Sequence, residues 1–326
     1  MPELPEVEVV RSGLARHLLG ARIEAVEVLD ARSLRRHTGP VDTFSSSLVG
    51  GTIRDVCRRG KYMWLRLTRG TESREHEDPV CDPRAVVVHL GMSGQTLLKP
   101  SMAPPERHLR IRWTLRGADG ELLELRFVDQ RIFGGMYLDP VVNVTDESGA
   151  PVPAASTSVL GLPEIPSTVA HIGRDPLDPH FNEASFRRRL RATSSGIKRV
   201  LLDQNTISGI GNIYADEALW RARIHYAKPA RSLTKSQAQE LLSACTVVMT
   251  EALAEGGTSF DALYVNVNGE SGYFERGLNV YGREGKPCRR CATEGSDTLI
   301  IREAFMNRSS YRCPTCQRTP RGFTRA

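Results

Sequence analysis

The chain has 326 residues, of which 25% are charged, and a formal net charge of +6 at pH 7. This length is sufficient for two or more domains, each with its own core. Apolar residues near the start form only short runs such as Val9-Val10, so the sequence predicts neither a signal peptide nor a membrane span, and we expect a cytoplasmic protein.

The first segment with helical periodicity begins at Pro5 and ends before Gly20. Proline is favoured at the first helical position and glycine just beyond the last. One face is apolar and consists of Val7, Val10, Leu14 and Leu18. We therefore predict an amphipathic helix with Glu3 and Glu6 at its positive end.

Strand-like segments follow the first helix. Two sets of residues alternate over 62–67 and again over 109–115, and the strand-like stretches 86–89 and 122–128 add further strands. We predict that residues 1–139 form a β-sandwich with the first helix packed on it.

Residues 140–180 contain seven prolines and little periodicity, which is typical of a domain linker. From residue 181 the pattern becomes helical. Thr234 and Gln237 form a capping-box pattern, and Gly256-Gly257 would end the helix that follows it. The predicted fold class is therefore α+β and multidomain.

Pro2 is a candidate nucleophile, because removal of Met1 would make its secondary amine the N-terminus. An α-amino group has a pKa of about 8, against about 10.4 for lysine, so far more of it is free base at neutral pH. Such an amine can attack the anomeric carbon of a sugar, and the resulting iminium stays cationic and drives elimination. Taken alone, Pro2 is better explained as a signal for methionine removal, with Pro5 starting the helix.

Four of the seven cysteines form two Cys-x-x-Cys pairs, Cys288 with Cys291 and Cys313 with Cys316. Four thiolates complete the tetrahedral shell of Zn²⁺ and leave no position for water. We therefore predict one structural zinc ion per chain. The other three cysteines are scattered singly, which suits a reducing compartment.

Positive charge is concentrated around these pairs. Residues 281–326 contain ten Arg and Lys residues against four acidic residues, whereas the first 280 residues balance at 34 each. A neutral body with a basic C-terminal segment favours a polyanionic partner. Within this segment Arg308 precedes Cys313 on a turn that the metal would fix, so its guanidinium could bind a phosphate.

Three further segments are consistent with nucleic-acid recognition. Residues 208–212, Ser-Gly-Ile-Gly-Asn, precede a helix, where backbone N–H groups and Asn212 could face an anion. Residues 89–94 and 129–134 present large side chains between glycines, as the wedges that separate base steps do. Taken singly, an ordinary interhelical turn and core packing explain these segments as well.

Together these motifs resemble bacterial formamidopyrimidine-DNA glycosylases in order and spacing. The matching segments are 2–6, 59–62, 89–94, 129–134, 198–203, 211–217, 272–274, 280–283 and the four-cysteine ribbon. The resemblance implies a bifunctional DNA glycosylase and AP lyase of base excision repair. Such an enzyme flips an oxidised purine, 8-oxoguanine or a formamidopyrimidine, out of damaged double-stranded DNA and cuts the strand by β,δ-elimination.

The resemblance also implies roles for individual residues. Pro2 would attack C1′, and Glu3 would be the acid and base that assists ring opening and later proton transfers. Lys61, Asn212 and Arg308 would hold DNA phosphates, and Met92, Arg131 and Phe133 would occupy the void left by the flipped base. His89 and Lys198 are expected as further DNA-binding residues, and Glu6 and Tyr273 at the lesion pocket. The implied domains are a catalytic domain at 1–139, a linker at 140–180, a helix-two-turns-helix domain with a lesion-capping loop at 181–284, and a zinc finger at 285–326. The resemblance also implies a monomer that is associated with the bacterial nucleoid.

Several features depart from the family pattern. The wedge loop of the family commonly reads Asp-Pro-Arg-Arg-Phe-Gly, whereas Gln130 and Ile132 replace its proline and second arginine here. Segments 70–84 and 142–160 look like insertions, and the gap between the cysteine pairs is longer than expected.

Two alternatives stay open. Endonuclease VIII uses the same nucleophile on oxidised pyrimidines, but it usually has glycine where Leu4 stands. A paralogue that only binds DNA should have lost Pro2, Glu3 or Lys61, and all three are present.

Overall fold

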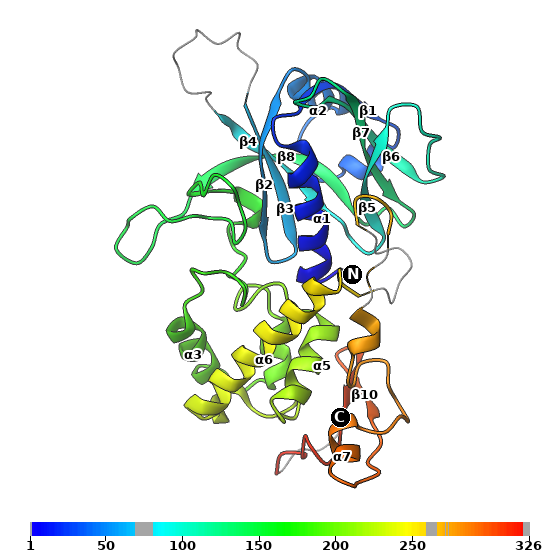
Figure 1. Ribbon diagram of the computed structural model, residues 1–326. Helices are drawn as coiled ribbons and strands as arrows, with labels where there is room; N and C mark the ends of the chain where they lie inside the picture. The colour runs from blue at the N-terminus through cyan, green and yellow to red at the C-terminus, as the bar shows by residue number, and fades with distance from the viewer. Residues whose placement is uncertain (1, 69–80, 259–265, 271, 273, 322–326) are drawn as a thin grey trace. The chain divides into compact units, whose positions relative to one another are not determined.

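The computed structural model describes residues 2–68, 81–258, 266–270, 272 and 274–321 (Figure 1). The chain divides into two compact units. Unit 1 contains Met1–His171 and Glu255–Tyr273, and unit 2 contains Ile172–Ala254 and Phe274–Ala326. No helix in the described parts of the chain is both long and apolar enough to cross a membrane.

Unit 1 is built on an antiparallel sheet of nine strands in the order β5-β7-β6-β1-β2-β3-β4-β8-β9. The strands are β1 Arg22–Val28, β2 Thr52–Arg59, β3 Tyr62–Thr68, β4 Cys81–His89, β5 Gly94–Pro100, β6 Leu109–Arg116, β7 Leu122–Asp129, β8 Gly135–Asn143 and β9 Glu164–Pro166. The helical segments are α1 Leu4–Leu18, η1 Ala31–Leu34, α2 Val41–Leu48 and η2 Ser167–Val169.

The sheet closes into the predicted β-sandwich. Its two halves meet at one registered pair, Arg22 of β1 opposite Thr52 of β2. Both halves contribute to a single buried apolar cluster, for example Trp113 and Phe127 from one half and Leu65 and Val86 from the other. The same cluster includes the apolar face of α1, so this helix is part of the core, and it lies beside β2 and β3 in Figure 1.

The first helix forms as predicted, although it begins at Leu4, one residue before Pro5. Its N-terminal turn is closed by a capping box between Glu3 and Glu6. A capping box satisfies backbone donors that have no partner inside the helix. The start of the chain is therefore fixed on the core.

The expected strand alternation is confirmed in β6 but is wrong in β3. In β6 alternate residues from Leu109 to Leu115 are buried, whereas in β3 Trp64 and Arg66 are buried together with their apolar neighbours. Arg66 forms an ion pair with Glu164 at the start of β9. The second face of β3 is therefore also covered, which removes the period of two.

The proline-rich stretch expected as a linker packs into unit 1 as far as His171. Strand β9 pairs with β8 at the edge of the sheet, where proline is tolerated because no further strand needs its missing N–H. Ala154, Ile165 and Val169 are completely buried. Residues 144–171 thus cover unit 1 and are not an extended connection.

Unit 2 combines helices with a small hairpin. Its elements are α3 Glu183–Arg191, α4 Ile197–Leu202, α5 Asn212–Arg221, η3 Ala230–Ser232, α6 Lys235–Ala254, η4 Phe274–Gly277, α7 Arg289–Thr293, β10 Ile301–Phe305 and β11 Arg308–Arg312. The capping box of α6 is present, because Gln237 N donates to Thr234 Oγ1 at 3.1 Å. The helical segment and the cysteine-bearing hairpin both lie in unit 2, whereas residues 255–273 belong to unit 1.

Candidate functional site

The N-terminal turn of α1 presents Pro2 and Glu3, both of which are buried. The Glu6 carboxylate accepts hydrogen bonds at 2.9 Å from Glu3 N, Thr258 N and Thr258 Oγ1. Gly257 makes this approach possible, since a Cβ there would lie 3.3 Å from the Glu6 side chain and its φ is +86°. Glu6 thus joins the two segments, while Tyr273, its expected neighbour at a lesion pocket, lies outside the described residues.

Lys61 lies at the tip of the β2–β3 hairpin. The loop has two residues, Gly60 and Lys61, and Gly60 adopts the positive φ of 58° that such a tight turn favours. Arg58 donates to Gly60 O at 3.1 Å and to the Glu8 carboxylate at 2.7 Å. Because Glu8 is on α1, Arg58 connects the helix that carries Pro2 and Glu3 to the turn that carries Lys61.

The two wedge loops, residues 89–94 and 129–134, are held together by the buried Asp129. Its carboxylate accepts hydrogen bonds from Ser93 Oγ in the first loop and from Arg131 N and Gly134 N in its own loop. Gly91 and Gly134 permit close backbone contact, because a Cβ on Gly91 would lie 2.4 Å from Gly134 N. The two loops therefore form one rigid edge of unit 1.

The large side chains of this edge point outward. Met92 is 39% exposed and Phe133 is 50% exposed, and Arg131 is exposed as well. Single exposed apolar side chains are common on protein surfaces, but these two lie on loops that Asp129 holds together, which suits a contact surface. The core-packing interpretation of Met92 and Phe133 is therefore wrong.

The departure from the family pattern at Ile132 has a visible structural consequence. Ile132 has a φ of 56°, a region that β-branched residues rarely occupy. The guanidinium of Arg35, which follows η1, donates to Ile132 O and Phe133 O. Arg35 is therefore the contact that stabilises the strained loop.

His89 ends β4 beside these loops and is partly buried. Its Nδ1 accepts a hydrogen bond from Gly91 N at 3.1 Å. Burial, together with the positive charges of Arg36 and Arg35, lowers the pKa of His89 to about 4. The ring is thus neutral at pH 7 and can offer DNA a hydrogen bond but no charge.

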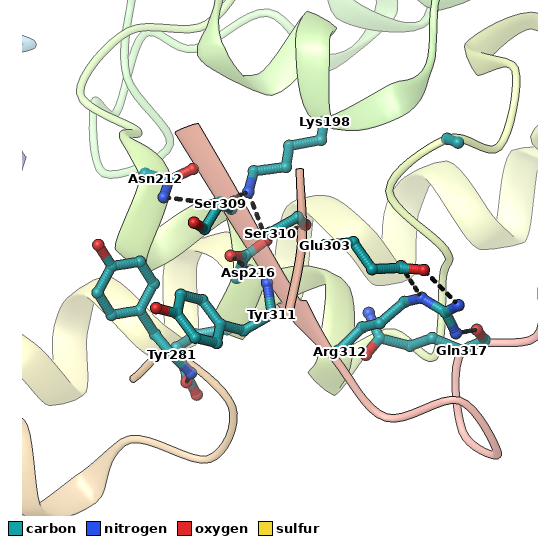
Figure 2. A network of polar contacts seen from close by, with 12 residues as sticks. Lys198, Asn212, Asp216, Tyr281, Glu303, Ser309, Ser310, Tyr311, Arg312 and Gln317 are labelled. Carbon is teal, nitrogen blue, oxygen red and sulfur yellow. Dashed lines mark hydrogen bonds and ion pairs between the residues drawn. The ribbon is translucent and has the colours of Figure 1, made fainter. Parts of the chain in front are cut away.

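Asn212 is the first residue of α5 in unit 2. The preceding turns are organised by Gln204, whose amide donates to Leu202 O and Ile210 O and accepts from Gly209 N. Asn212 Nδ2 donates to Ser309 O at 2.9 Å (Figure 2). An amide nitrogen carries two hydrogens, so one is left for a ligand.

Lys198, which the sequence predicts as a DNA-binding residue, lies in the interior of unit 2. Its side chain is completely buried, and its ammonium lies 2.7 Å from Asp216 Oδ1 and 3.4 Å from Ser309 O. Burial raises the pKa of Asp216, and the neighbouring Lys198 opposes this shift. Because a fully buried ammonium cannot reach a phosphate from this position, Lys198 acts inside unit 2.

Arg308 lies where the sequence predicts, directly after the β10–β11 turn. The turn residues Met306 and Asn307 both have positive φ, at 46° and 58°, and Phe305 pairs with Arg308 across the hairpin. Such two-residue turns match the natural twist of a hairpin. The Arg308 side chain is exposed at the end of this hairpin.

The four cysteines expected to bind metal converge in unit 2. The Sγ atoms of Cys288, Cys291, Cys313 and Cys316 all lie within 4.8 Å of one another, and the closer pairs are 3.5 to 3.9 Å apart. Four sulfurs at about 2.3 Å from one zinc ion would be separated by about 3.8 Å. The donor set and its spacing therefore fit a tetrahedral zinc ion.

Sequence reasoning missed several residues that position this site. They are Glu8, Arg35, Arg58, Ser93, Gln204, Asp216 and Trp220. The side chain of each makes a hydrogen bond or an ion pair with another residue near the site. The pattern Asp216-Glu217 inside a helix carried a detectable signal, because adjacent acidic residues on a mostly apolar helix suggest buried partners. The others carry no local signal.

The comparisons with known families agree with this arrangement. Residues 1–136 match the formamidopyrimidine-DNA glycosylase N-terminal domain, and residues 172–262 match the formamidopyrimidine-DNA glycosylase H2TH domain.

Two relatives named formamidopyrimidine-DNA glycosylase are each 54% identical to the chain over 321 residues. The relative from Nocardioides sp. covers 98% of this chain and 96% of its own length, and the relative from Salinispora arenicola covers 98% of each. A solved structure of Lactococcus lactis Fpg with DNA containing an abasic site has a TM-score of 0.74 and 29% identity, and covers 97% of this chain and all of its own. A structure of MutM with DNA containing carbocyclic 8-oxo-G has the same TM-score and identity, with 98% and 100% coverage.

Proposed function

The chain belongs to the formamidopyrimidine-DNA glycosylase family, and on this basis we propose that it removes oxidised purines from duplex DNA and then cuts the strand. The observation that carries the residue assignment is the placement of Pro2 and Glu3 on the capped first turn of α1. A nucleophile and an acid–base group require a fixed geometry to act on one sugar. The capping box and the core contacts of α1 supply it.

The proposed reaction begins after removal of Met1. The Pro2 nitrogen bonds to C1′ while the bond from C1′ to the base breaks, and Glu3 supplies the proton that opens the sugar ring. The resulting iminium then acts as an electron sink. Loss of a proton from the sugar to a general base breaks the C3′–O3′ bond, and a second elimination breaks the C5′–O5′ bond. Hydrolysis of the iminium would restore the free amine for another turnover.

Lys61, Asn212 and Arg308 are the proposed phosphate contacts. Lys61 and Arg308 lie at hairpin turns, Lys61 partly exposed and Arg308 exposed, and Asn212 retains an amide hydrogen. Phosphate contacts fix the register of the duplex and carry no sequence information. Met92, Arg131 and Phe133 would fill the void left by the flipped base, with Arg131 facing the unpaired partner, while His89 adds an uncharged contact.

Glu6 and Tyr273 remain proposed residues of the lesion pocket. Glu6 contacts Thr258, which directly precedes the segment 259–265. A lesion held near Thr258 would lie next to the first turn of α1. The Glu6 carboxylate would then act mainly by fixing the pocket, because its oxygens already accept three hydrogen bonds.

We propose Zn²⁺ as the ion held by the four cysteines, as one structural ion per chain. A closed shell of thiolates has no open position for water or substrate, so the ion would stabilise the hairpin that carries Arg308. The partner would be damaged double-stranded DNA, bound by a monomer in the cytoplasm. The catalytic role falls to 1–139, and DNA binding to 181–284 and 285–326.

Borohydride trapping tests the covalent step. Borohydride should reduce the iminium and link the protein to duplex DNA that contains 8-oxoguanine opposite cytosine, with intact mass confirming the loss of Met1. Glu3→Gln should bind the same DNA but lose base excision. Undamaged duplex is the control. If turnover proceeds without any trapped adduct, or with Met1 still attached, the assignment of Pro2 is wrong.

A further inference from the structure

One face of α5 makes polar contacts to the hairpin β10–β11 and to the cysteine Cys288. Asn212, Asp216 and Trp220 are spaced four residues apart, so they lie on the same face of the helix. Asn212 contacts Ser309 O, and Trp220 Nε1 donates to Cys288 Sγ at 3.4 Å. The residue between them, Asp216, makes the largest number of these contacts, as Figure 2 shows.

Asp216 binds the strand that begins with Arg308. Its Oδ1 accepts from Ser310 Oγ and its Oδ2 accepts from Tyr311 N, both at 2.9 Å. These donors follow Arg308 by two and three residues. The carboxylate is 1% exposed, so water does not compete for these hydrogen bonds.

Lys198 completes the arrangement from α4. Its ammonium pairs with Asp216 at 2.7 Å and also lies 5.0 Å from the ring centroid of Phe305, the residue opposite Arg308. The same ammonium is 3.4 Å from Ser309 O. Both strands next to the turn are therefore in contact with a single buried ion pair.

We propose that Asp216 is a positioning residue for Arg308, an inference that rests on the proposed phosphate-binding role of Arg308. Met306 is the strained residue of the turn, because it adopts positive φ without being glycine or asparagine. A two-residue turn sets only the pairing of its own two strands, so contacts from outside the hairpin define its orientation. Asp216 supplies these contacts and so directs the guanidinium of Arg308.

A double-mutant cycle on the zinc-loaded full chain tests this inference. Asp216→Asn, Arg308→Ala and the double variant are titrated with duplex DNA that contains a stable abasic-site analogue, over a range of salt concentrations. Each single variant should weaken binding by roughly tenfold and reduce the salt slope by about one counterion. The double variant should bind no more weakly than Arg308→Ala alone, because Asp216 acts through Arg308.

Asp178→Asn is the matched control, since Asp178 is also a buried carboxylate of unit 2 and accepts from Arg174 Nη1 at 2.8 Å. It should leave the salt slope unchanged. Ser310→Ala removes one hydrogen bond to Asp216 and keeps the ion pair, so it repeats the cycle with a milder change if Asp216→Asn does not fold. Its smaller loss of affinity should also vanish in the Arg308→Ala background.

The possible failures are distinguishable. Additive losses of affinity in the cycle, or wild-type binding by both Asp216→Asn and Ser310→Ala, would overturn the positioning role and leave the proposed function intact. An unchanged salt slope in Arg308→Ala would instead remove Arg308 from the proposed phosphate contacts, and the inference about Asp216 would fail with it.

Discussion

His89 provides a quantitative test of the environment beside the wedge loops. Its pKa of about 4 in the folded protein lies below the value of about 6.5 for an unfolded histidine. The unfolded state therefore binds a proton first as the pH falls. Stability is full above pH ~6.5 and is lost progressively as the pH falls toward 4.

The expected loss follows from these two values. Between pH 7.5 and pH 5 the unfolded imidazole becomes almost fully protonated while the folded one stays neutral, which corresponds to about 2 kcal/mol. His89 retains some solvent exposure, which screens the charges of Arg35 and Arg36, so the effect should be between about 1 and 2 kcal/mol. Replacing His89 with glutamine should remove this part of the acid sensitivity.

Urea unfolding at both pH values, followed through the buried Trp64 and Trp113 of unit 1, measures the difference. His17→Gln is the control, because it removes an exposed imidazole of the same unit. An NMR titration of His89 gives the pKa directly, and His89→Gln should bind DNA more weakly with an unchanged salt slope. A His89 pKa of 6 or above, or equal acid sensitivity in His89→Gln and the unaltered protein, would refute this reasoning.

Three further substitutions have defined expectations. Arg58→Met removes one of the two buried arginines that pair with the Glu8 carboxylate, Arg11 being the other, together with the hydrogen bond to Gly60 O, and should cost about 2 kcal/mol in thermal unfolding, while slowing single-turnover excision because the Lys61 turn loosens; unchanged stability would contradict this. Ile132→Asn should raise stability by about 1 kcal/mol, since asparagine tolerates positive φ, and a lower melting temperature would count against strain at this position. Cys291→Ser should reduce the metal content measured by mass spectrometry to well below one ion per chain, and full stoichiometry would argue against the four-thiolate site.

Periodicity predicted the elements that have one buried and one exposed face. Helix α1 and strand β6 fit this description, and both are where the sequence places them. It failed for β3, because residues from the proline-rich stretch cover the face that alternation assigned to solvent. That stretch resembled a linker because prolines and an irregular pattern are typical of linkers, and they do not indicate contacts with residues far away in the chain.

The candidate site likewise contains some residues that the sequence predicts and others that it does not. Short motifs identified Pro2, Arg308 and the cysteines, because their chemistry depends on residue type and local spacing. They could not identify contacts such as that of Arg35 with Ile132 O, or that of Ser310 with Asp216, which lie 97 and 94 residues apart in the chain. For Lys198 the family resemblance suggested a DNA contact, and no local pattern indicated its burial against Asp216.

Glu6, Asp129 and Asp216 show why buried carboxylates recur next to the proposed DNA contacts. Each accepts hydrogen bonds from a segment distant in the chain, and Asp129 and Asp216 do so beside the exposed side chains of Phe133 and Arg308. Such loops bury little apolar surface of their own, and apolar contact is non-directional, so it cannot fix their register. Charge-assisted hydrogen bonds are directional and stronger than neutral ones. A loop that must present Phe133 or a strand that must present Arg308 in one orientation is therefore held best by a carboxylate, even though burying the charge carries a desolvation penalty.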